Sequence, residues 1–407
     1  MQDNEKKPAL RFKGFTDPWE QRKLGEIAVF SKGVGYSKND LCEEGTPIIL
    51  YGRLYTKYET CIFDVDTFVK EKAGGVYSKG GEVIVPASGE TAEDISIASV
   101  VVKPGILLGG DLNIVSPTAE YDSAFLALTI SSGATHKYLS SLAQGKSVVH
   151  LHNADIQSVS AKFPTKREQE KIHLLFGKID TLITLHQRKY EKLVNIKKSM
   201  LDKMFPPNGA SVPEIRFKGF TDPWEQRKFG EVVDKYEDPV ETPHDGYYRL
   251  GIRSHAKGTF HSYVEKGHEL ETAQMYRVAA GNFIVNITFG WEHAVAITNE
   301  SDAGKLVSHR FPQYSFHDDM LPEFFKYVIA DEDFRHWLWL ASPGGAGRNR
   351  VLKLDEMLNY EMVLPSKEEQ QRIAAIFRNL DTLITLHQRK LEKLQNIKKS
   401  CLEKMFV

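Results

Sequence analysis

The sequence has little cysteine and no long hydrophobic run. Its three cysteines, Cys42, Cys61 and Cys401, are odd in number and lack the spacing of a zinc site, which suits a reducing, cytoplasmic environment. No apolar stretch reaches the length of a membrane-spanning helix, and the opening residues, MQDNEKK, do not resemble a signal peptide. We therefore expect a cytoplasmic protein that makes no contact with a membrane.

An excess of either charge is also lacking. Lys+Arg number 53 and Asp+Glu number 54, for a net charge of −1 at pH 7. A polyanionic partner would have to be bound by local basic patches rather than by the overall charge of the chain.

Several enzyme motifs are absent as well. The sequence contains no G-x-x-x-x-G-K-[ST] phosphate loop and no Asp/Asn-Pro-Pro-Tyr motif of amino-methyltransferases. Its histidines do not have the spacing of metal ligands. Catalysis by this chain alone is therefore not predicted.

What the sequence does contain is a duplication. The repeated stretches are DTLITLHQRK at 180–189 and 381–390, and RFKGFTDPWEQRK at 11–23 and 216–228. Self-similarity over such a long period indicates two copies of one unit. The segments between the repeats, 26–160 and 231–361, share almost no sequence. We therefore predict a duplicated frame that carries two unlike globular domains.

Each copy ends in a long amphipathic helix. Apolar residues recur at spacings of three and four from Ile172 to Met200 and from Ile373 to Ile397, after the capping-box sequences Thr165–Glu168 and Ser366–Glu369. The sequence FPPNG at 205–209 ends the first helix. Two helices with matching apolar stripes would pack on each other, and the order globule–helix–globule–helix requires them to be antiparallel.

The predicted fold class is α+β. Two globular α/β domains are separated by an antiparallel two-helix coiled-coil spacer, with a pseudo-two-fold internal repeat. The predicted segments are 8–25 (N-terminal repeated segment), 26–160 (first globular domain), 164–206 (central helix), 213–230 (second repeated segment), 231–361 (second globular domain) and 365–406 (C-terminal helix). His186 and His387 occupy equivalent positions in the apolar seam, where they could fix the register, face water or form a pH-sensing pair.

Both globular domains contain side chains that suit DNA. Arginine pairs with guanine and asparagine with adenine, while lysine mostly binds phosphate. Each candidate could equally be a solvated loop residue, and the three consecutive residues from Arg348 to Arg350 fit that explanation least well. The candidates are Lys32, Ser37, Lys38, Tyr51, Arg53, Ser88, Glu90, Thr91, Lys146 and Ser147 in the first domain, and Arg249, Arg253, His255, Lys257, Phe289, Trp291, His293, Arg348, Asn349 and Arg350 in the second.

The frame resembles a known family. The pattern Pro-x-x-x-Glu-Gln…Asp-Thr-Leu-Ile at Pro164–Ile183 and Pro365–Ile384, around divergent inserts, is similar to the specificity subunit of type I DNA restriction–modification systems. The resemblance implies that 26–160 and 231–361 are target recognition domains, each of which reads one half of a bipartite, asymmetric target in double-stranded DNA. It also implies a non-catalytic chain whose helices set the spacing and dock two methyltransferase (modification) subunits, which restriction/translocase subunits then join. S-adenosylmethionine, ATP and Mg²⁺ would bind to those partners.

Two other functions stay open from the residues alone. A stand-alone regulator, a pseudo-dimer that binds a split operator, would use the same two unlike domains but would have no partner on its helices. A single-chain nuclease or methyltransferase would need motifs that the sequence lacks.

Overall fold

The computed structural model describes residues 7–145, 148–207, 209–270, 274–344 and 350–406. The chain forms two compact units, which we call unit 1 (1–189 and 387–407) and unit 2 (190–386). No helix among the described residues is both long enough and apolar enough to cross a membrane.

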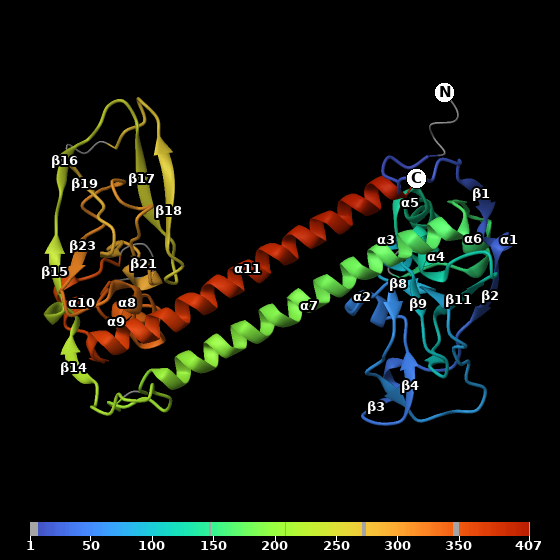
Figure 1. Cartoon of the computed structure of the whole chain (residues 1–407), viewed down its shortest axis with the longest axis horizontal. Coiled ribbons are helices and arrows are strands. Elements are labelled where there is room, and N and C mark those ends of the chain that lie inside the picture. Colours follow the sequence, from blue (N-terminus) through green and yellow to red (C-terminus); the bar gives the residue numbers. More distant parts are fainter. Residues whose placement is uncertain (1–6, 146–147, 208, 271–273, 345–349, 407) are drawn as a thin grey trace. The chain divides into compact units, whose positions relative to one another are not determined.

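Two long helices contribute to both units. They are α7 (Lys166–Met204) and α11 (Lys367–Met405), each of 39 residues and roughly 60 Å long at the standard rise per residue. In unit 1, Asp180 and His186 of α7 contact Lys398 and His387 of α11. Because residue numbers rise on one helix as they fall on the other, the two helices pack antiparallel (Figure 1), as the sequence predicted.

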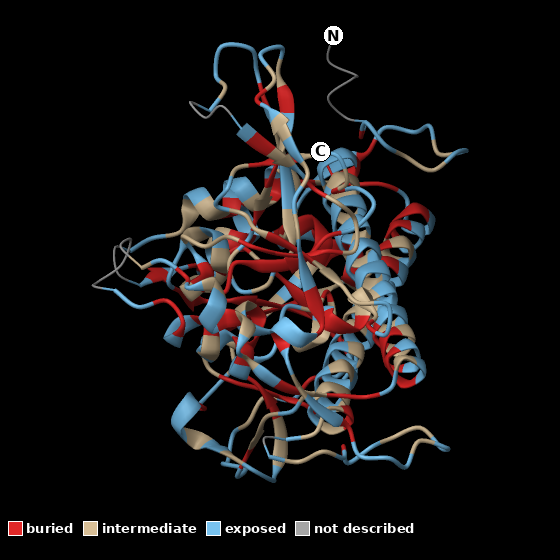
Figure 2. Ribbon diagram, turned by 90° about the vertical axis from the view of Figure 1, so that its left-hand side faces the viewer, coloured by how far each residue is buried: buried red, intermediate tan, exposed pale blue. Residues whose placement is uncertain are grey.

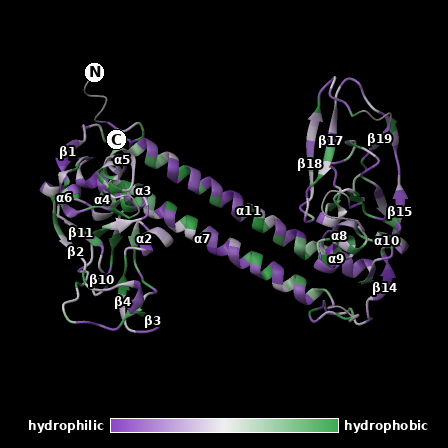
Figure 3. Ribbon diagram, turned by 180° about the vertical axis from the view of Figure 1, so that it is seen from behind, coloured by the Kyte–Doolittle hydropathy of each residue, from purple (hydrophilic) through white to green (hydrophobic). Residues whose placement is uncertain are grey.

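The apolar stripe of each helix is buried mainly where it meets a globular domain. Ile172 and Phe176 of α7 are buried in unit 1, and Ile373 and Phe377 of α11 are buried in unit 2. Hydrophobic and hydrophilic residues alternate along both helices (Figure 3), and much of their surface is exposed or intermediate (Figure 2). Two helices alone cannot enclose a seam, so its residues stay partly accessible to solvent.

The globular head of unit 1 is built on a sheet with strand order β2–β11–β7–β9–β5. These strands are β2 (Ala28–Lys32), β11 (Leu112–Pro117), β7 (Glu82–Pro86), β9 (Ser99–Val101) and β5 (Cys61–Ile62). In β7, Val83 and Val85 join the main core while Ile84 joins a second core on the other face. Burial on both faces explains the unbroken β-branched run in this strand.

Smaller elements complete this head. A second sheet has the order β10–β4–β6–β3, from β10 (Leu107–Leu108), β4 (Thr46–Ile49), β6 (Phe68–Val69) and β3 (Leu41–Cys42). The helices are α1 (Leu24–Ile27), α2 (Arg53–Thr56), α3 (Ala92–Ile95), α4 (Ser123–Ile130), α5 (Gly133–Leu142) and α6 (Asn153–Ser158). The short strands β8 (Ser88–Gly89) and β12 (Val149–His150) pair with each other, as do β1 (Glu20–Lys23) and β13 (Ser160–Phe163).

The head of unit 2 has a central sheet with the order β15–β23–β20–β21 and a larger second sheet, β16–β19–β22–β17–β18. The central strands are β15 (Val233–Tyr236), β23 (Gln313–Phe316), β20 (Phe283–Val285) and β21 (Val295–Ile297). The second sheet has β16 (Pro239–Glu241), β19 (Gln274–Arg277), β22 (Leu306–Val307), β17 (Tyr247–Ile252) and β18 (Thr259–Val264). The remaining elements are α8 (Pro322–Val328), α9 (Glu332–Leu340), α10 (Leu354–Leu358), β14 (Glu225–Lys228) and β24 (Glu361–Leu364).

The two heads share one core despite their unlike sequences. The strands β2–β11–β7–β9 correspond in order and antiparallel pairing to β15–β23–β20–β21. In each head two helices follow, then a short helix, then a strand that pairs with the repeated segment. The duplication therefore includes the central sheet and the following helices of each head. The two heads differ mainly in their second sheets and loops.

The repeated segment joins the ends of the two long helices. In unit 1, Arg11 binds both carboxylate oxygens of Glu168 at the start of α7, and the Leu10 N–H donates to the carbonyl of Lys404 near the end of α11 (2.9 Å). In unit 2, Arg216 binds Glu369, and the Ile215 N–H donates to the carbonyl of Lys203 (2.9 Å). The repeated segment therefore makes the same contacts in both units. Its arginine binds the start of one long helix, and the residue before that arginine binds the end of the other.

The same joint includes the predicted helix starts. The helices α7 and α11 begin directly after Thr165 and Ser366, as the capping-box sequences predicted. The Oγ of Ser366 accepts the N–H of Glu369 at 3.4 Å. The carboxylates of Glu168 and Glu369 also bind arginine, in bidentate, charge-assisted pairs.

A glutamine beside each of these glutamates connects the helix to its head. The Oε1 atom of Gln169 accepts the N–H of Asp122, which caps α4, at 2.9 Å. The Oε1 atom of Gln370 accepts the N–H of Leu321, which precedes α8, at 2.9 Å. Each head is therefore attached to the frame through the same contact.

Candidate nucleic-acid interface

Equivalent loops connect the central strands of the two heads. In unit 1 the loop 87–98 runs from β7 to β9, and in unit 2 the loop 286–294 runs from β20 to β21. Six residues predicted separately in the two domains lie on these loops. They are Ser88, Glu90 and Thr91 in unit 1, and Phe289, Trp291 and His293 in unit 2.

Left-handed backbone conformations occur on or against the same two loops. Non-glycine residues in the left-handed region cost about 1–3 kcal/mol each and concentrate at functional sites. Those among the described residues are Asp111, His255, Ala256 and His293, at φ of 58°, 61°, 49° and 62°. The carbonyl of Asp111 accepts the N–H of Ala87 in the first loop, and the N–H groups of His255 and Ala256 donate to carbonyls of the second. Left-handed residues therefore hold the backbone of both loops through hydrogen bonds.

A second segment lies against each loop. In unit 1, β12 pairs with β8, and the Oγ of Ser88 lies 3.0 Å from the Nδ1 of His150. In unit 2, the Leu352 N–H donates to the carbonyl of Ile287 (2.9 Å). The predicted residues Lys146, Ser147, Arg348 and Asn349 lie outside the described residues. Arg350 is described, and its guanidinium lies over the ring of Trp339 at 4.8 Å.

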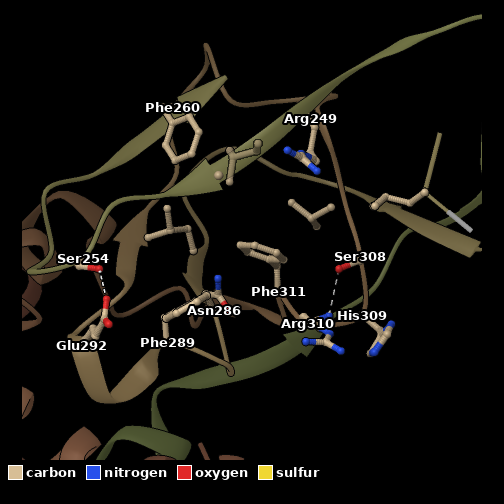
Figure 4. A pocket seen from close by; sticks show the side chains of 15 residues that line it. Arg249, Ser254, Phe260, Asn286, Phe289, Glu292, Ser308, His309, Arg310 and Phe311 are labelled. Atoms are coloured by element: carbon tan, nitrogen blue, oxygen red, sulfur yellow. Dashed lines mark hydrogen bonds between the residues drawn. The ribbon is translucent and has the colours of Figure 1, made fainter. Parts of the chain in front are cut away.

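The loop of unit 2 borders a hollow of about 720 Å³ (Figure 4). Its walls come from β17, from the β20–β21 loop and from the connection between β22 and β23. The polar or aromatic side chains around it include Arg249, Asn286, Phe289, Ser308, His309, Arg310, Phe260 and Phe311.

The hollow is electropositive. The side chains of Arg249 and His309 have no hydrogen-bond or ion-pair partner among the described residues, and the guanidinium of Arg310 has only a 3.4 Å contact with the Oγ1 of Thr288. Among the described residues, the one acidic lining residue is Glu292, whose carboxylate accepts the hydroxyl of Ser254 at 2.7 Å. Cations with aromatic neighbours in a concave surface are the chemistry that binds phosphates and base edges.

Three of the predicted DNA contacts have buried side chains. Arg53 is 8% exposed and is held by Glu59 (2.6 Å) and Asp66 (2.9 Å). His293 is 3% exposed, with its Nε2 2.6 Å from the carbonyl of Ile329, and burial lowers its pKa. Ser88 is 7% exposed, and its hydroxyl binds a histidine of the adjoining strand. All three stabilise the heads from within.

The other predicted residues lie nearer to solvent. The hydroxyls of Ser37 and Thr91 are engaged in turns, with Asp40 and Asp94. Arg253 donates to the carbonyl of Thr259 and stacks on Phe260. Tyr51 and Trp291 are half-buried, whereas Lys32, Lys38, Glu90, His255 and Lys257 are exposed.

Six of these lining residues were not predicted from the sequence. They are Phe260, Asn286, Ser308, His309, Arg310 and Phe311. A signal was present, because Ser308–Arg310 is a short basic stretch followed by Phe311, the same combination that led to the other candidates. Asn286 gave no such signal, since a single asparagine after a strand is also a common turn residue.

Comparison with known proteins finds likenesses that cover both repeats. Residues 16–195 and 222–396 match the family model described as type I restriction modification DNA specificity domain. The type I restriction enzyme MjaVIII specificity subunit of Methanocaldococcus jannaschii is 21% identical over 400 residues, which cover 94% of this chain and 91% of that protein. The crystal structure of the type-I restriction-modification system S subunit from M. genitalium has a TM-score of 0.61 at 12% identity, with 98% of this chain and 99% of that one covered.

Proposed function

Because the chain belongs to the family of type I restriction–modification DNA specificity proteins, we propose that it is the DNA-reading subunit of such a complex. Each head reads one half of a bipartite, asymmetric target in double-stranded DNA. The observation that supports this best is a shared core whose equivalent loops differ, SGET at 88–91 and FGWE at 289–292. A two-fold frame with identical loops would favour a palindrome, and unlike loops favour two different half-sites.

The helices suit a docking and spacing role. Leu182 and Leu185 on α7 are 42% and 45% exposed, and their repeats on α11, Leu383 and Leu386, are 42% and 43% exposed. Exposed apolar side chains at repeated positions suit one partner that binds twice. We propose that this partner is the methyltransferase subunit, which restriction/translocase subunits join, and that the helix pair sets the distance between the half-sites.

The chemistry belongs to those partners in this proposal. S-adenosylmethionine, ATP and Mg²⁺ would bind to the partner subunits, and this chain would be non-catalytic. Incubation of the purified chain with DNA, Mg²⁺ and S-adenosylmethionine should yield neither cleaved nor methylated DNA, and product formed by the chain alone would contradict the proposal.

A head exchange tests the assignment of half-sites. Residues 26–160 are replaced with the corresponding head of another family member, in cells that supply the partner subunits, and methylated sites are mapped by sequencing. One half of the target should change and the other should stay. A change in both halves, or in neither, would contradict the proposal.

Co-purification tests the partners. The wild-type chain should bring down a methyltransferase from its own host, and replacement of Leu182 and Leu185 by glutamate should weaken that association. A chain that binds DNA tightly and stays monomeric in its host would instead be a stand-alone regulator of a split operator.

A further inference from the structure

The hollow in unit 2 contains arginines without counter-ions. By contrast, Arg11, Arg53 and Arg216 each bind a carboxylate. Arg249 is half-buried on β17 and Arg310 is exposed, and neither has an ion pair within the described parts of the chain. Partial burial of an uncompensated guanidinium is unfavourable, so a bound ligand is expected to supply the missing acceptors.

Asn286 adds an oriented amide to these cations. Its Oδ1 accepts the Thr288 N–H (3.1 Å) and its own backbone N–H donates to the carbonyl of Ala294 (3.0 Å). Because the oxygen is fixed by a backbone donor, the assignment of the amide is fixed too. The Nδ2 atom, a donor, is left to face the hollow between Phe289 and Phe311 (Figure 4).

The free polar groups of the hollow are therefore mostly donors. Arg249, Arg310 and the Nδ2 of Asn286 all donate, and Glu292, the one carboxylate among the described lining residues, accepts the hydroxyl of Ser254. In the major groove guanine presents two adjacent acceptors, N7 and O6, while cytosine presents a donor. A set of donors selects guanine and rejects cytosine.

The surroundings hold these donors in place. Ser254 and Glu292 connect the end of β17 to the β20–β21 loop, and the left-handed His255 bonds to the same loop. Phe260 and Phe289 stand at the hollow as partly exposed apolar walls, which exclude water and strengthen hydrogen bonds to a ligand. Preorganisation of this kind is what discrimination between bases requires.

We propose that Arg249, Asn286 and Arg310 are the base-reading residues of unit 2 and that they select a guanine in its half-site. This rests on the proposed function, in which unit 2 reads one half of a DNA target.

The test is a comparison of methylated sites in cells that carry the partner subunits. Asn286→Asp keeps the shape and the oxygen that accepts the Thr288 N–H but replaces the Nδ2 donor by an acceptor. Arg249→Lys keeps the charge but loses the bidentate fork. Each variant should lower the preference for guanine at one position of one half-site by about 10- to 100-fold, with the other half-site unchanged. Lys326→Ala, on α8, is the control and should leave both half-sites as in wild type.

Several outcomes would overturn the inference. These are a wild-type half-site for unit 2 without guanine, a change at the half-site of unit 1, or an equal loss of methylation at all sites, which would make the residues phosphate contacts only. An Arg310→Ala variant with the sequence preference of wild type would show that Arg310 does not read a base. Failure of the proposed function looks different, because wild type would then methylate no bipartite site. Purified variants should melt within a few degrees of wild type, which separates lost recognition from lost folding.

Discussion

Arg11 and Glu168 form a buried, bidentate ion pair, with both N–O distances at 2.7 Å, and Arg216 repeats it with Glu369 at 2.8 Å. The two arginines lie in the repeated segment and the two glutamates at the starts of the long helices. The pair therefore connects the repeated segment to the start of each long helix, and a change in either partner would leave a charge without its counterpart.

Replacement of Arg11 by alanine should destabilise unit 1 strongly. The carboxylate of Glu168 is 0% exposed, and an unpaired buried charge costs about 3–5 kcal/mol. Chemical denaturation followed by circular dichroism measures the change. Arg22→Ala is the matched control, because Arg22 and its partner Glu20 are exposed and such pairs contribute about 0–1 kcal/mol. Equal losses for the two variants would contradict the prediction.

The ion pair between His173 and Asp122 should make unit 1 less stable at high pH. The hydrogen bond to Asp122, and then the neighbouring Cys61, raise the pKa of His173 to about 10, although burial opposes the shift. Because an unfolded histidine titrates near 6.5, the stabilisation is complete below about pH 6.5. It is lost as the pH rises from there through 10. Melting temperatures across this range should fall for wild type and fall less for His173→Asn.

The pair His186 and His387 should make the helix pair less stable at low pH. Their Nδ1 atoms lie 2.8 Å apart across the seam, so one of them must be unprotonated to accept. Burial, and then the charges of His186, Lys189 and Lys390, lower the pKa of His387. Protons therefore favour the unfolded chain, and stability should fall as the pH drops below about 6.5. His387→Asn should flatten this part of the melting profile, and an unchanged profile would count against the pair as its source.

Arg53 should act on stability and not on sequence preference. It binds Glu59 and Asp66 inside the head of unit 1, so Arg53→Met should lower the melting temperature of unit 1. The half-site read by that head should stay the same in methylation maps. A shifted half-site with an unchanged melting temperature would restore Arg53 to the DNA interface.

The frame could be predicted from the sequence because its signals are local. The apolar spacing between Ile172 and Met200, the stop at 205–209 and the exact recurrence of 180–189 each lie within one stretch of chain. The antiparallel packing then followed from the order of the segments. Individual ion pairs across the seam, such as Asp180 with Lys398, were not predicted.

The shared core of the heads could not be predicted in this way. A buried strand requires apolar volume and not particular residues, so Val83 in β7 and Phe283 in β20 fill equivalent buried places with different side chains. Prediction of the DNA-binding residues from the sequence was limited for a related reason. Arg53 resembles a DNA contact until Glu59 and Asp66 are seen to surround it, and the sequence does not show which carboxylates a loop brings near an arginine.

Gln169 binds the start of α4 and Gln370 binds the start of α8 through equivalent hydrogen bonds. The two heads are therefore attached to the long helices in the same way. A head taken from one position has the backbone donor that the other position expects. The two heads should consequently be interchangeable, and a chain built with them in reversed order should still fold. It would recognise the same two half-sites in transposed order, so new targets can arise by rearranging whole heads while the joints stay untouched.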